Sequence, residues 1–366
     1  MKKNVFIAVG VLTVIVIGVL FFLNDTGEKQ AVIRIGAILP LTGDAAVAGH
    51  NTKKGIDLAV NEINRRGGIN GLNLRVIYED TKAVPKTGVN ATKKLIDRDK
   101  VCYIIDNSIS AVTLAVAPLF KNRDCVLLST GASSPEITNA GENIYRIWNS
   151  DYEEASAMAD FVVREFEGKK LLVLYTNTEY GIGLKNAFMG TFSSKDNVDE
   201  SVLGEDGGIP QNVFGRISQY DAIYLVAYSR QSAYATKQLI ENGFAGVFLG
   251  TSVMLDLNVQ EEFMRIQNDL YYPSPKTQDE GNLSYANFVK EYETTYGTKP
   301  VPLSDVGYDA VMIFCHALSE KSDRTTTYEK IKSYFETQVF EGASGIMQFD
   351  ANGDVHKEIV INKLEK

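Results

Sequence analysis

The sequence AVIRIGAIL, at residues 31–39, and the segment that follows it decide the fold. The run is almost entirely apolar and rich in β-branched side chains, which is typical of a parallel strand buried on both faces. Residues 53–66 then repeat apolar side chains at the spacing of one helical face, and the pair Gly67-Gly68 predicts the end of that helix. A strand followed by a helix of this length is the repeating unit of a parallel sheet covered by helices.

The same alternation of strands and helices continues along the chain and restarts after residue 150. The expected strands are 74–78, 101–106, 126–129, 170–175, 222–226 and 246–249, and the expected helices are 86–97, 110–121, 153–166, 181–192, 231–242 and 305–318. Residues 256–300 are less regular, and the strands 345–349 and 355–361 are expected to form a hairpin around 350–353. Since 366 residues exceed what one core usually holds, the repetition predicts an α/β protein of two similar lobes.

The composition excludes several classes of function. The net charge is −9, and no cluster of Lys and Arg offers a basic face for nucleic acid. The 3 cysteines and 3 histidines show no metal-ligand spacing, so we expect no metal and no cofactor. Gly181-Ile182-Gly183 lacks the third glycine of a dinucleotide fingerprint, because Asn186 stands in its place. Residues 350–354 lack the distal glutamate of a calcium loop and predict a hairpin turn instead.

Catalytic machinery is also absent from the sequence. No serine lies in a nucleophile elbow, and no Cys or Ser has a histidine and an acid arranged for nucleophilic attack. Paired carboxylates such as Glu153-Glu154 and Glu261-Glu262 are interpreted as solvated charges on polar helix faces. We therefore expect a binding protein and not an enzyme.

Residues 1–30 are interpreted as a separate N-terminal segment and linker. Lys2 and Lys3 precede an uncharged apolar run at 4–23 that is long enough to span a bilayer. An ordinary signal peptide with a poor cleavage site and an uncleaved transmembrane anchor both fit this pattern, and no cysteine nearby can accept a lipid. Either alternative places the protein in the periplasm or on the outer face of the cytoplasmic membrane.

Two of the cysteines, Cys102 and Cys125, lie near the starts of strands that are expected to be neighbours. In an oxidising compartment such a pair can form a disulfide. The alternative is that these two residues and Cys315 are all buried thiols.

Two turns rich in hydroxyl side chains follow strands of the first series. Residues 107–110 follow the strand ending at Asp106, and residues 130–135 follow the strand ending at Ser129. Free N–H groups at a helix N-terminus, with hydroxyls beside them, form a neutral receptor for a carboxylate or a similar anion. Open α/β sheets bind their ligands at this edge. Simple helix capping by serine is the alternative that the spacing leaves open.

The order of several short motifs resembles a known family. These motifs are Gly36–Gly43, Gly55–Ala59, Asn61–Asn64, Gly67–Gly71, Gly131–Pro135, Tyr180–Gly183, Tyr308–Ala310 and Gly345–Asp354. Together they are similar to the type I periplasmic binding proteins, and most to the leucine/isoleucine/valine-binding group that feeds ABC importers. The resemblance implies two Rossmann-like lobes with parallel central sheets, joined by three crossovers. It assigns residues 31–150 and 276–340 to the first lobe, and 151–275 and 341–366 to the second.

The resemblance also implies a ligand site between the lobes. In the family the first lobe holds the ligand carboxylate, and the matching positions are Ser110, the backbone of Gly131, and Ser133. Tyrosines of the second lobe close over the ligand, and Tyr180 and Tyr228 match them. The first-lobe positions lie in the same two turns that the hydroxyl side chains indicate on their own.

Two positions depart from the pattern of the family. Ser252 stands where the resemblance implies an acid that pairs with the ligand ammonium, and Ala48 replaces an aromatic residue of the pocket. A buried ammonium without a carboxylate partner is costly, so either another acid such as Asp256 approaches or the ligand is not a standard amino acid. Trp148, just before an expected crossover, either stacks on an aromatic ligand or packs at the hinge.

We therefore expect the extracytoplasmic solute-binding component of an ABC importer. It is expected to be a monomer that delivers a small carboxylate-bearing ligand, an amino acid or a related compound, to a permease in the membrane. The alternatives are a membrane-anchored ligand-sensing domain that regulates a partner, and a binder of amides or aromatic acids.

Overall fold

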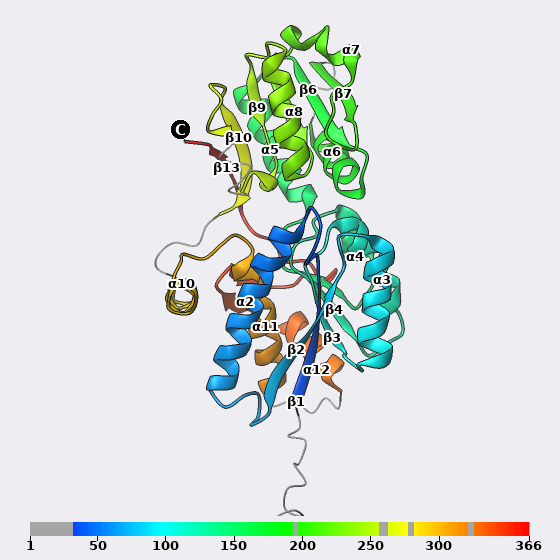
Figure 1. Cartoon of the computed structure of the whole chain (residues 1–366), viewed down its shortest axis with the longest axis vertical. Coiled ribbons are helices and arrows are strands. Elements are labelled where there is room, and N and C mark those ends of the chain that lie inside the picture. Colours follow the sequence, from blue (N-terminus) through cyan, green and yellow to red (C-terminus); the bar gives the residue numbers. More distant parts are fainter. Residues whose placement is uncertain (1–31, 193–196, 256–262, 277–281, 321–325, 366) are drawn as a thin grey trace, which may run out of the picture.

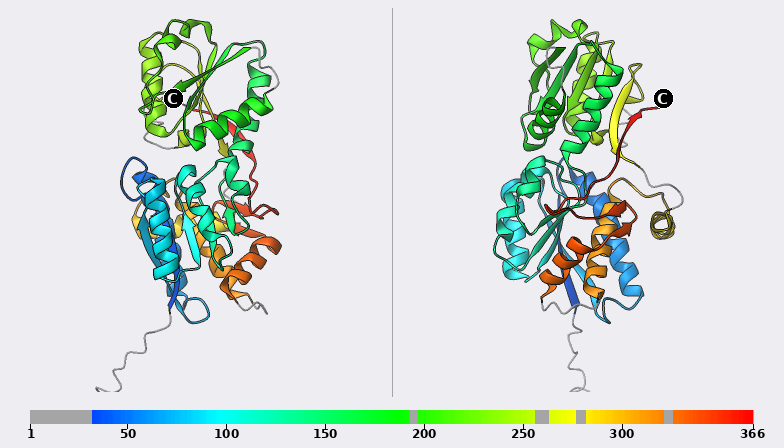
Figure 2. Two further views of the ribbon diagram at one scale, coloured as in Figure 1. Left: turned by 90° about the vertical axis from the view of Figure 1, so that its right-hand side faces the viewer. Right: turned by 180° about the vertical axis from the view of Figure 1, so that it is seen from behind.

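The computed structural model of the chain describes residues 32–192, 197–255, 263–276, 282–320 and 326–365. Two lobes are stacked along the longest axis of the molecule, and each has a central sheet with helices on both faces (Figures 1 and 2). The predicted α/β architecture with two parallel-sheet lobes is confirmed. The predicted signal or anchor at 4–23 lies outside the described residues, and no helix within them combines the length and apolar character needed to cross a bilayer.

The sheet of the first lobe contains five parallel strands in the order β2-β1-β3-β4-β5. These strands are β1 (Val32–Leu39), β2 (Asn73–Asp80), β3 (Tyr103–Asp106), β4 (Val126–Ser129) and β5 (Ile144–Arg146). Strand β1 lies inside the sheet between β2 and β3, and its residues from Ile35 to Leu39 are all buried. This burial explains why the strand reads as a continuous apolar run instead of an alternating one.

Helices cover both faces of this first sheet. They are α2 (Ala46–Arg65), α3 (Pro85–Lys93), the π-helical turn η1 (Lys94–Arg98), α4 (Ser110–Val116), η2 (Ala117–Phe120), η3 (Pro135–Asn139), α10 (Leu283–Tyr296), α11 (Ser304–Ser319) and α12 (Thr327–Thr337). Helices α2 and α11 approach so closely that a Cβ atom on Gly55 would lie 1.8 Å from the carbonyl oxygen of Ser304. The same contact from the other side puts a Cβ on Gly307 only 2.4 Å from the carbonyl oxygen of Thr52. Glycine is therefore required on both helices, because any side chain would push them apart.

The sheet of the second lobe contains six strands in the order β13-β10-β9-β8-β6-β7. They are β6 (Leu171–Thr176), β7 (Val198–Leu203), β8 (Ala222–Val226), β9 (Val247–Leu249), β10 (Leu270–Pro275) and β13 (Ile359–Lys363), and β13 alone among them runs antiparallel. The helices are α5 (Asp151–Glu165), α6 (Glu179–Thr191), α7 (Gln211–Phe214), α8 (Ser229–Glu241) and the 3-10 turns η5 (Ile217–Gln219) and η6 (Ser252–Leu255). Strand β10 was not predicted from the sequence, because its two prolines weaken the strand pattern.

The chain passes between the lobes three times: between β5 and α5, between β10 and α10, and before β13. The predicted boundary at residue 341 is wrong. The hairpin of β11 (Phe340–Gly342) and β12 (Gly345–Met347) packs in the core of the first lobe, as do Phe349 and Val355. The last crossing therefore lies between Val355, which packs in the first lobe, and β13, which pairs in the second sheet. The expected hairpin of 345–349 with 355–361 is wrong, because β12 pairs with β11 and β13 pairs with β10. Only the turn at 350–353 is present, closed by an isolated antiparallel bridge between Phe349 and Val355.

The two cysteines that were expected to be neighbours do lie side by side. Tyr103 pairs with Val126 in the parallel register of β3 and β4, which places Cys102 opposite Cys125. Both are free thiols here, Cys125 buried and Cys102 exposed. The disulfide stays a prediction that this geometry permits.

Candidate functional site

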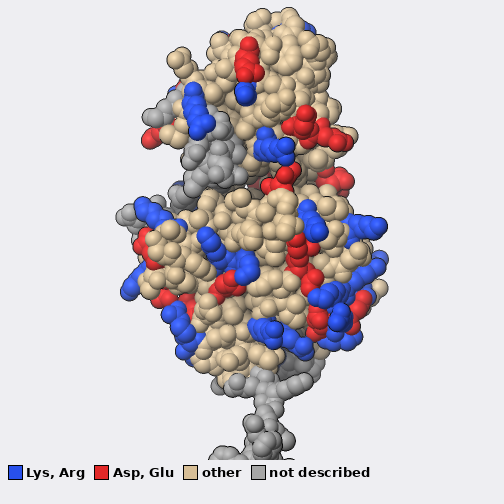
Figure 3. Space-filling view, in the orientation of Figure 1, with Lys and Arg blue, Asp and Glu red and all other residues tan. Residues whose placement is uncertain are grey.

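The carboxyl-terminal edges of the two sheets face each other where the lobes meet. Figure 3 shows the molecule narrowing at this junction. The N-terminus of α6 approaches η3 of the first lobe, so that a Cβ on Gly183 would lie 3.3 Å from the hydroxyl of Ser134. Arg230 at the start of α8 forms an exposed ion pair with Asp44 of the first lobe, at 3.2 Å. Each predicted site residue that the structure describes can therefore be placed relative to this junction.

Ser110 is the first residue of α4 and is only 2% exposed. Its hydroxyl accepts a hydrogen bond from the backbone N–H of Ser134, at 3.2 Å, so the two predicted turns touch. The capping position of α4 belongs to Ile109, and Ser110 makes no capping hydrogen bond. Simple capping therefore explains Ser134, whose hydroxyl accepts from the N–H of Glu136, but does not explain Ser110.

A buried acid, Asp106, shapes the loop that leads to Ser110. Its carboxylate accepts from the N–H of Ser108 at 2.9 Å and from the hydroxyl of Thr113. Burial raises its pKa to about 6, against the opposing effect of these hydrogen bonds. Gly131, on the neighbouring turn, has no space for a side chain, because a Cβ there would lie 2.6 Å from Nδ2 of Asn107.

The turn that carries Ser133 is held by a fully buried arginine. Arg146 donates from Nη1 to the carbonyl oxygens of Ser133 and Ser134, at 3.1 and 2.9 Å. Its Nε and Nη2 donate to the two carboxylate oxygens of Asp354 at 2.9 and 2.8 Å, and Nη2 also donates to Thr138 at 3.0 Å. All five N–H groups of the guanidinium are thus engaged. The predicted ligand turn is thereby tied to the turn that precedes the last crossing between the lobes.

The two predicted tyrosines of the second lobe stack on each other. The rings of Tyr180 and Tyr228 are 4.9 Å apart and inclined by 22°. The Tyr180 hydroxyl donates to the hydroxyl of Thr251 at 2.9 Å. The structure therefore places the tyrosine pair beside the loop that contains Ser252.

Ser252 begins η6 and donates its N–H to a carboxylate oxygen of Glu154, at 2.9 Å. Glu154 is only 3% exposed, so the interpretation of this residue as a solvated charge is wrong. Burial raises its pKa to about 7, and the hydrogen bonds from Ser252 counteract part of that rise. A buried acid of α5 therefore lies against the position, Ser252, at which the resemblance implies an acid.

A second buried acid, Asp151, lies one turn earlier on the same helix and is 0% exposed. Its backbone N–H donates to the carbonyl of Ser133 at 2.7 Å, which brings it to the first-lobe turn. No donor among the described residues reaches either of its carboxylate oxygens with hydrogen-bond geometry. Burial, reinforced by the charge of Glu154, raises its pKa well above the usual value, while the Ser133 hydroxyl and the Arg146 charge counteract the rise.

This acid pair was not predicted from the sequence, although a signal for it is present. Helix α5 begins at Asp151, after the capping residue Ser150, and its buried positions are Asp151, Glu154, Ala155, Met158, Ala159, Phe161 and Val162. Asp151, Glu154, Ala155, Met158, Ala159 and Val162 each have another buried residue three or four positions away, which is the spacing of one helical face. Extending the apolar stripe back to the start of the helix would have placed both acids on the buried face.

The remaining predicted residues contribute less. Ala48 lies half-buried in α2, and Trp148 is partly buried against the core of the first lobe. Asp256 lies outside the described residues. No group of His, Cys, Asp and Glu within the described ranges is arranged to hold a metal ion.

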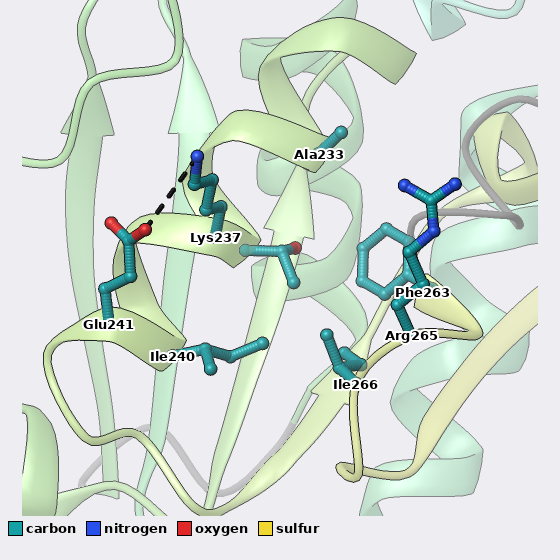
Figure 4. A pocket seen from close by; sticks show the side chains of 8 residues that line it. Ala233, Lys237, Ile240, Glu241, Phe263, Arg265 and Ile266 are labelled. Atoms are coloured by element: carbon teal, nitrogen blue, oxygen red, sulfur yellow. Dashed lines mark ion pairs between the residues drawn. The ribbon is translucent and has the colours of Figure 1, made fainter.

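A separate pocket of about 260 Å³ lies on the second lobe, between α8 and residues 263–266 (Figure 4). Thr236, Ile240 and Phe263 line it, and Lys237 and Glu241 form an ion pair at its side. It contains none of the predicted site residues, so we place the candidate site at the junction of the lobes.

The fold and the site can be compared with known proteins. Residues 32–361 match the family described as periplasmic binding protein. A Leu/Ile/Val-binding protein homolog 1 of Brucella abortus is 24% identical, over 97% of this chain and 94% of its own. A Leu/Ile/Val-binding protein homolog 3 of Brucella melitensis is 29% identical, but the match spans only 60% of this chain and 60% of that relative.

Solved structures share the architecture. A leucine-binding protein of Thermotoga maritima superposes with a TM-score of 0.78 at 27% identity, over 90% of this chain and 95% of its own. A solute-binding protein of Rhodopseudomonas palustris, solved with 3,4-dihydroxybenzoic acid, has a TM-score of 0.75 at 20% identity, over 91% and 93%. The second of these likenesses concerns the fold alone.

Proposed function

Because the chain belongs to the periplasmic binding protein family, a family of extracytoplasmic binding proteins and not of enzymes, we propose that it is the solute-binding component of an ABC importer. It binds a small carboxylate-bearing ligand between its lobes and delivers it, as a monomer, to a permease in the membrane. The leucine-binding protein of Thermotoga maritima supports an amino acid as the ligand, and the fold shared with a protein solved with 3,4-dihydroxybenzoic acid makes an aromatic acid the second ligand class to test.

One observation carries this proposal: the N-terminus of α6, which bears Tyr180, approaches the first-lobe turn, since a Cβ on Gly183 would lie 3.3 Å from the hydroxyl of Ser134. Ser110 and Ser133 are buried there, at 2% and 7% exposure. With the N–H of Gly131 they offer neutral donors to a ligand carboxylate. Tyr180 and Tyr228 then cover the ligand from the opposite lobe.

Binding requires the lobes to move, because the proposed contacts are buried where the lobes meet. Ligand enters when they part and is enclosed when they close, so ligand stabilises the closed arrangement by its contacts with both lobes. The three chain crossings supply the hinge. Arg230 and Asp44 join the lobes at the surface, where an exposed ion pair contributes little on its own.

The test is calorimetric titration of the purified protein with leucine, isoleucine, valine and 3,4-dihydroxybenzoate. Replacing Ser110 and Ser133 together by alanine is expected to weaken binding by about tenfold or more, because hydrogen bonds to a charged group contribute about 1.5–3 kcal/mol each. Ser319→Ala, an exposed serine at the end of α11, is the matched control and is expected to bind as the native protein does. Unchanged affinity in the double variant would contradict the carboxylate assignment.

A further inference from the structure

Two adjacent carboxylates, those of Asp151 and Glu154, are buried in this protein, which is unusual for acidic side chains. Both carboxylates lie on the inner face of α5, at 0% and 3% exposure. Glu154 keeps one donor, the N–H of Ser252, whereas neither carboxylate oxygen of Asp151 has a hydrogen bond of good geometry from a described residue. Burial without full replacement of the lost hydration is costly, and two adjacent carboxylates also repel each other. Apolar side chains at these positions would stabilise the fold better, so the pair calls for a role in binding.

The protein offers the pair little positive charge. The ionisable groups that face it are Arg146 from β5, Tyr180 from α6 and Tyr224 from β8, with Tyr228 facing Asp151. All N–H groups of Arg146 already donate to other partners. Burial and the two acids raise the pKa of the Tyr180 and Tyr224 phenols, so these rings are neutral.

An independent observation also points to a ligand at this place. The hydroxyl of Tyr224 is buried, in a side chain at 0% exposure, and has no hydrogen-bond partner among the described residues. Unsatisfied buried polar atoms are rare in native structures. Here the phenol of Tyr224, which has no partner, lies near the carboxylate of Asp151, which only the Ser133 hydroxyl approaches, beside the turn that we assign to the ligand carboxylate.

We propose that Asp151 and Glu154 bind the ammonium group of an α-amino acid, in place of the acid that the resemblance implies at Ser252, and that binding expels proton from the pair. This inference rests on the proposed function and narrows its ligand class. The N–H of Asp151 donates to the carbonyl of Ser133 at 2.7 Å, so the anionic and cationic ends of the ligand bind next to each other, as they stand in an α-amino acid. An aromatic acid has no cation to offer and would bring a third negative charge.

Release of a proton on binding follows from charge balance. The free pair retains proton near neutral pH, since burial disfavours two adjacent negative charges. An ammonium ion takes over the neutralising role, and the displaced proton passes to the buffer. Affinity for an amino acid should therefore increase as pH rises toward 7, and the measured heat should depend on the ionisation enthalpy of the buffer.

The experiment is titration calorimetry of the native protein with L-leucine at pH 6.5, in phosphate and in Bis-Tris, two buffers that differ in ionisation enthalpy. A second titration uses 4-methylpentanoate, which is leucine without its amino group. We expect proton release with leucine, and binding of 4-methylpentanoate that is weaker by about 100-fold, since it leaves the acids without their charged partner.

Two isosteric variants locate the effect. Asp151→Asn and Glu154→Gln are each expected to weaken leucine binding by about tenfold or more and to reduce proton release. Asp160→Asn and Glu165→Gln, on the exposed part of the same helix, are matched controls that should leave both quantities unchanged. If a variant fails to fold, proton release by the native protein still tests the inference.

The outcomes separate this inference from the proposed function. Leucine binding without proton release, or with native affinity in both variants, overturns the ammonium assignment and leaves the solute-binding function standing. Binding of 3,4-dihydroxybenzoate without binding of any tested amino acid also overturns the ammonium assignment and leaves the solute-binding function standing. A protein that binds neither class overturns the proposed function itself.

Discussion

Replacing Asp354 by asparagine is expected to destabilise the first lobe and to weaken ligand binding at the same time. Asp354 is 5% exposed and pairs with Arg146, which is 0% exposed, through both carboxylate oxygens. It also accepts from the hydroxyl of Thr138 at 2.6 Å. The variant leaves the arginine charge buried without its partner, because an amide carries no charge and turns an NH₂ group toward these donors.

The size of the effect follows from this geometry. Breaking a buried ion pair by removing one partner costs about 3–5 kcal/mol, and we take about 3 kcal/mol because asparagine keeps one acceptor oxygen. For a unit of 150–250 residues this corresponds to a fall of about 6–12 °C in Tm. Ligand affinity falls as well, since Arg146 also holds the carbonyls of Ser133 and Ser134.

The assay is thermal unfolding followed by circular dichroism, with calorimetric titration of leucine on the same samples. The control is Asp44→Asn, which removes the exposed ion pair with Arg230 and should leave the Tm unchanged, because solvent screens that pair. A Tm for Asp354→Asn within about 1 °C of the native value would show that the buried pair with Arg146 does not stabilise the lobe, since the expected fall is several times larger. Lower stability with native affinity would refute only the link to the ligand turn.

Three further variants test other parts of the molecule. Gly55→Ala should lower the free energy of unfolding by about 1–3 kcal/mol, and the Tm with it, because the new Cβ would lie 1.8 Å from the carbonyl oxygen of Ser304. A native Tm would contradict this packing. Glu154→Gln should raise the Tm at pH 8 and not at pH 4. Burial raises the pKa of Glu154 to about 7, so the fold is destabilised as pH rises from about 4.3 to 7, where the unfolded chain ionises this carboxyl more readily than the folded one. Glutamine carries no charge and removes that loss of stability. His356→Gln should lower the Tm at pH 5.5 but not at pH 8.5. The hydrogen bond with Glu153 raises the pKa of His356, and the ring loses its proton, and with it the ion pair, as pH rises. An equal fall in Tm at both pH values would contradict a stabilising ion pair.

The repeating elements of the fold could be predicted because each leaves a periodic signal. The strand 31–39 and the helix 53–66 appear in the structure as β1 and within α2, and the second series reproduces the same alternation. The crossing into the second lobe between Val355 and β13 left no such signal. Residues 355–361 read as one strand, whereas only the part from Ile359 onward pairs in the second sheet.

The candidate site was predictable where it lies on turns after strands, and not where a helix face decides it. Ser110 and Ser133 follow β3 and β4, and topology alone brings such turns to one edge. Glu154 was misread because a Glu-Glu pair is usually solvated, while the packing of α5 turns only one member inward. The helical spacing of the buried residues in α5 indicates this burial, but the contact of Glu154 with Ser252 is tertiary and leaves no local pattern.

The most direct test of the central claim is a crystal structure of the protein grown with leucine. We predict the ligand at the junction of the lobes, with its carboxylate on Ser110 and the turn Gly131–Ser133, its ammonium between Asp151 and Glu154, and Tyr180 against its side chain. Ligand bound in the pocket on α8, or no ligand between the lobes at saturating concentration, would contradict it.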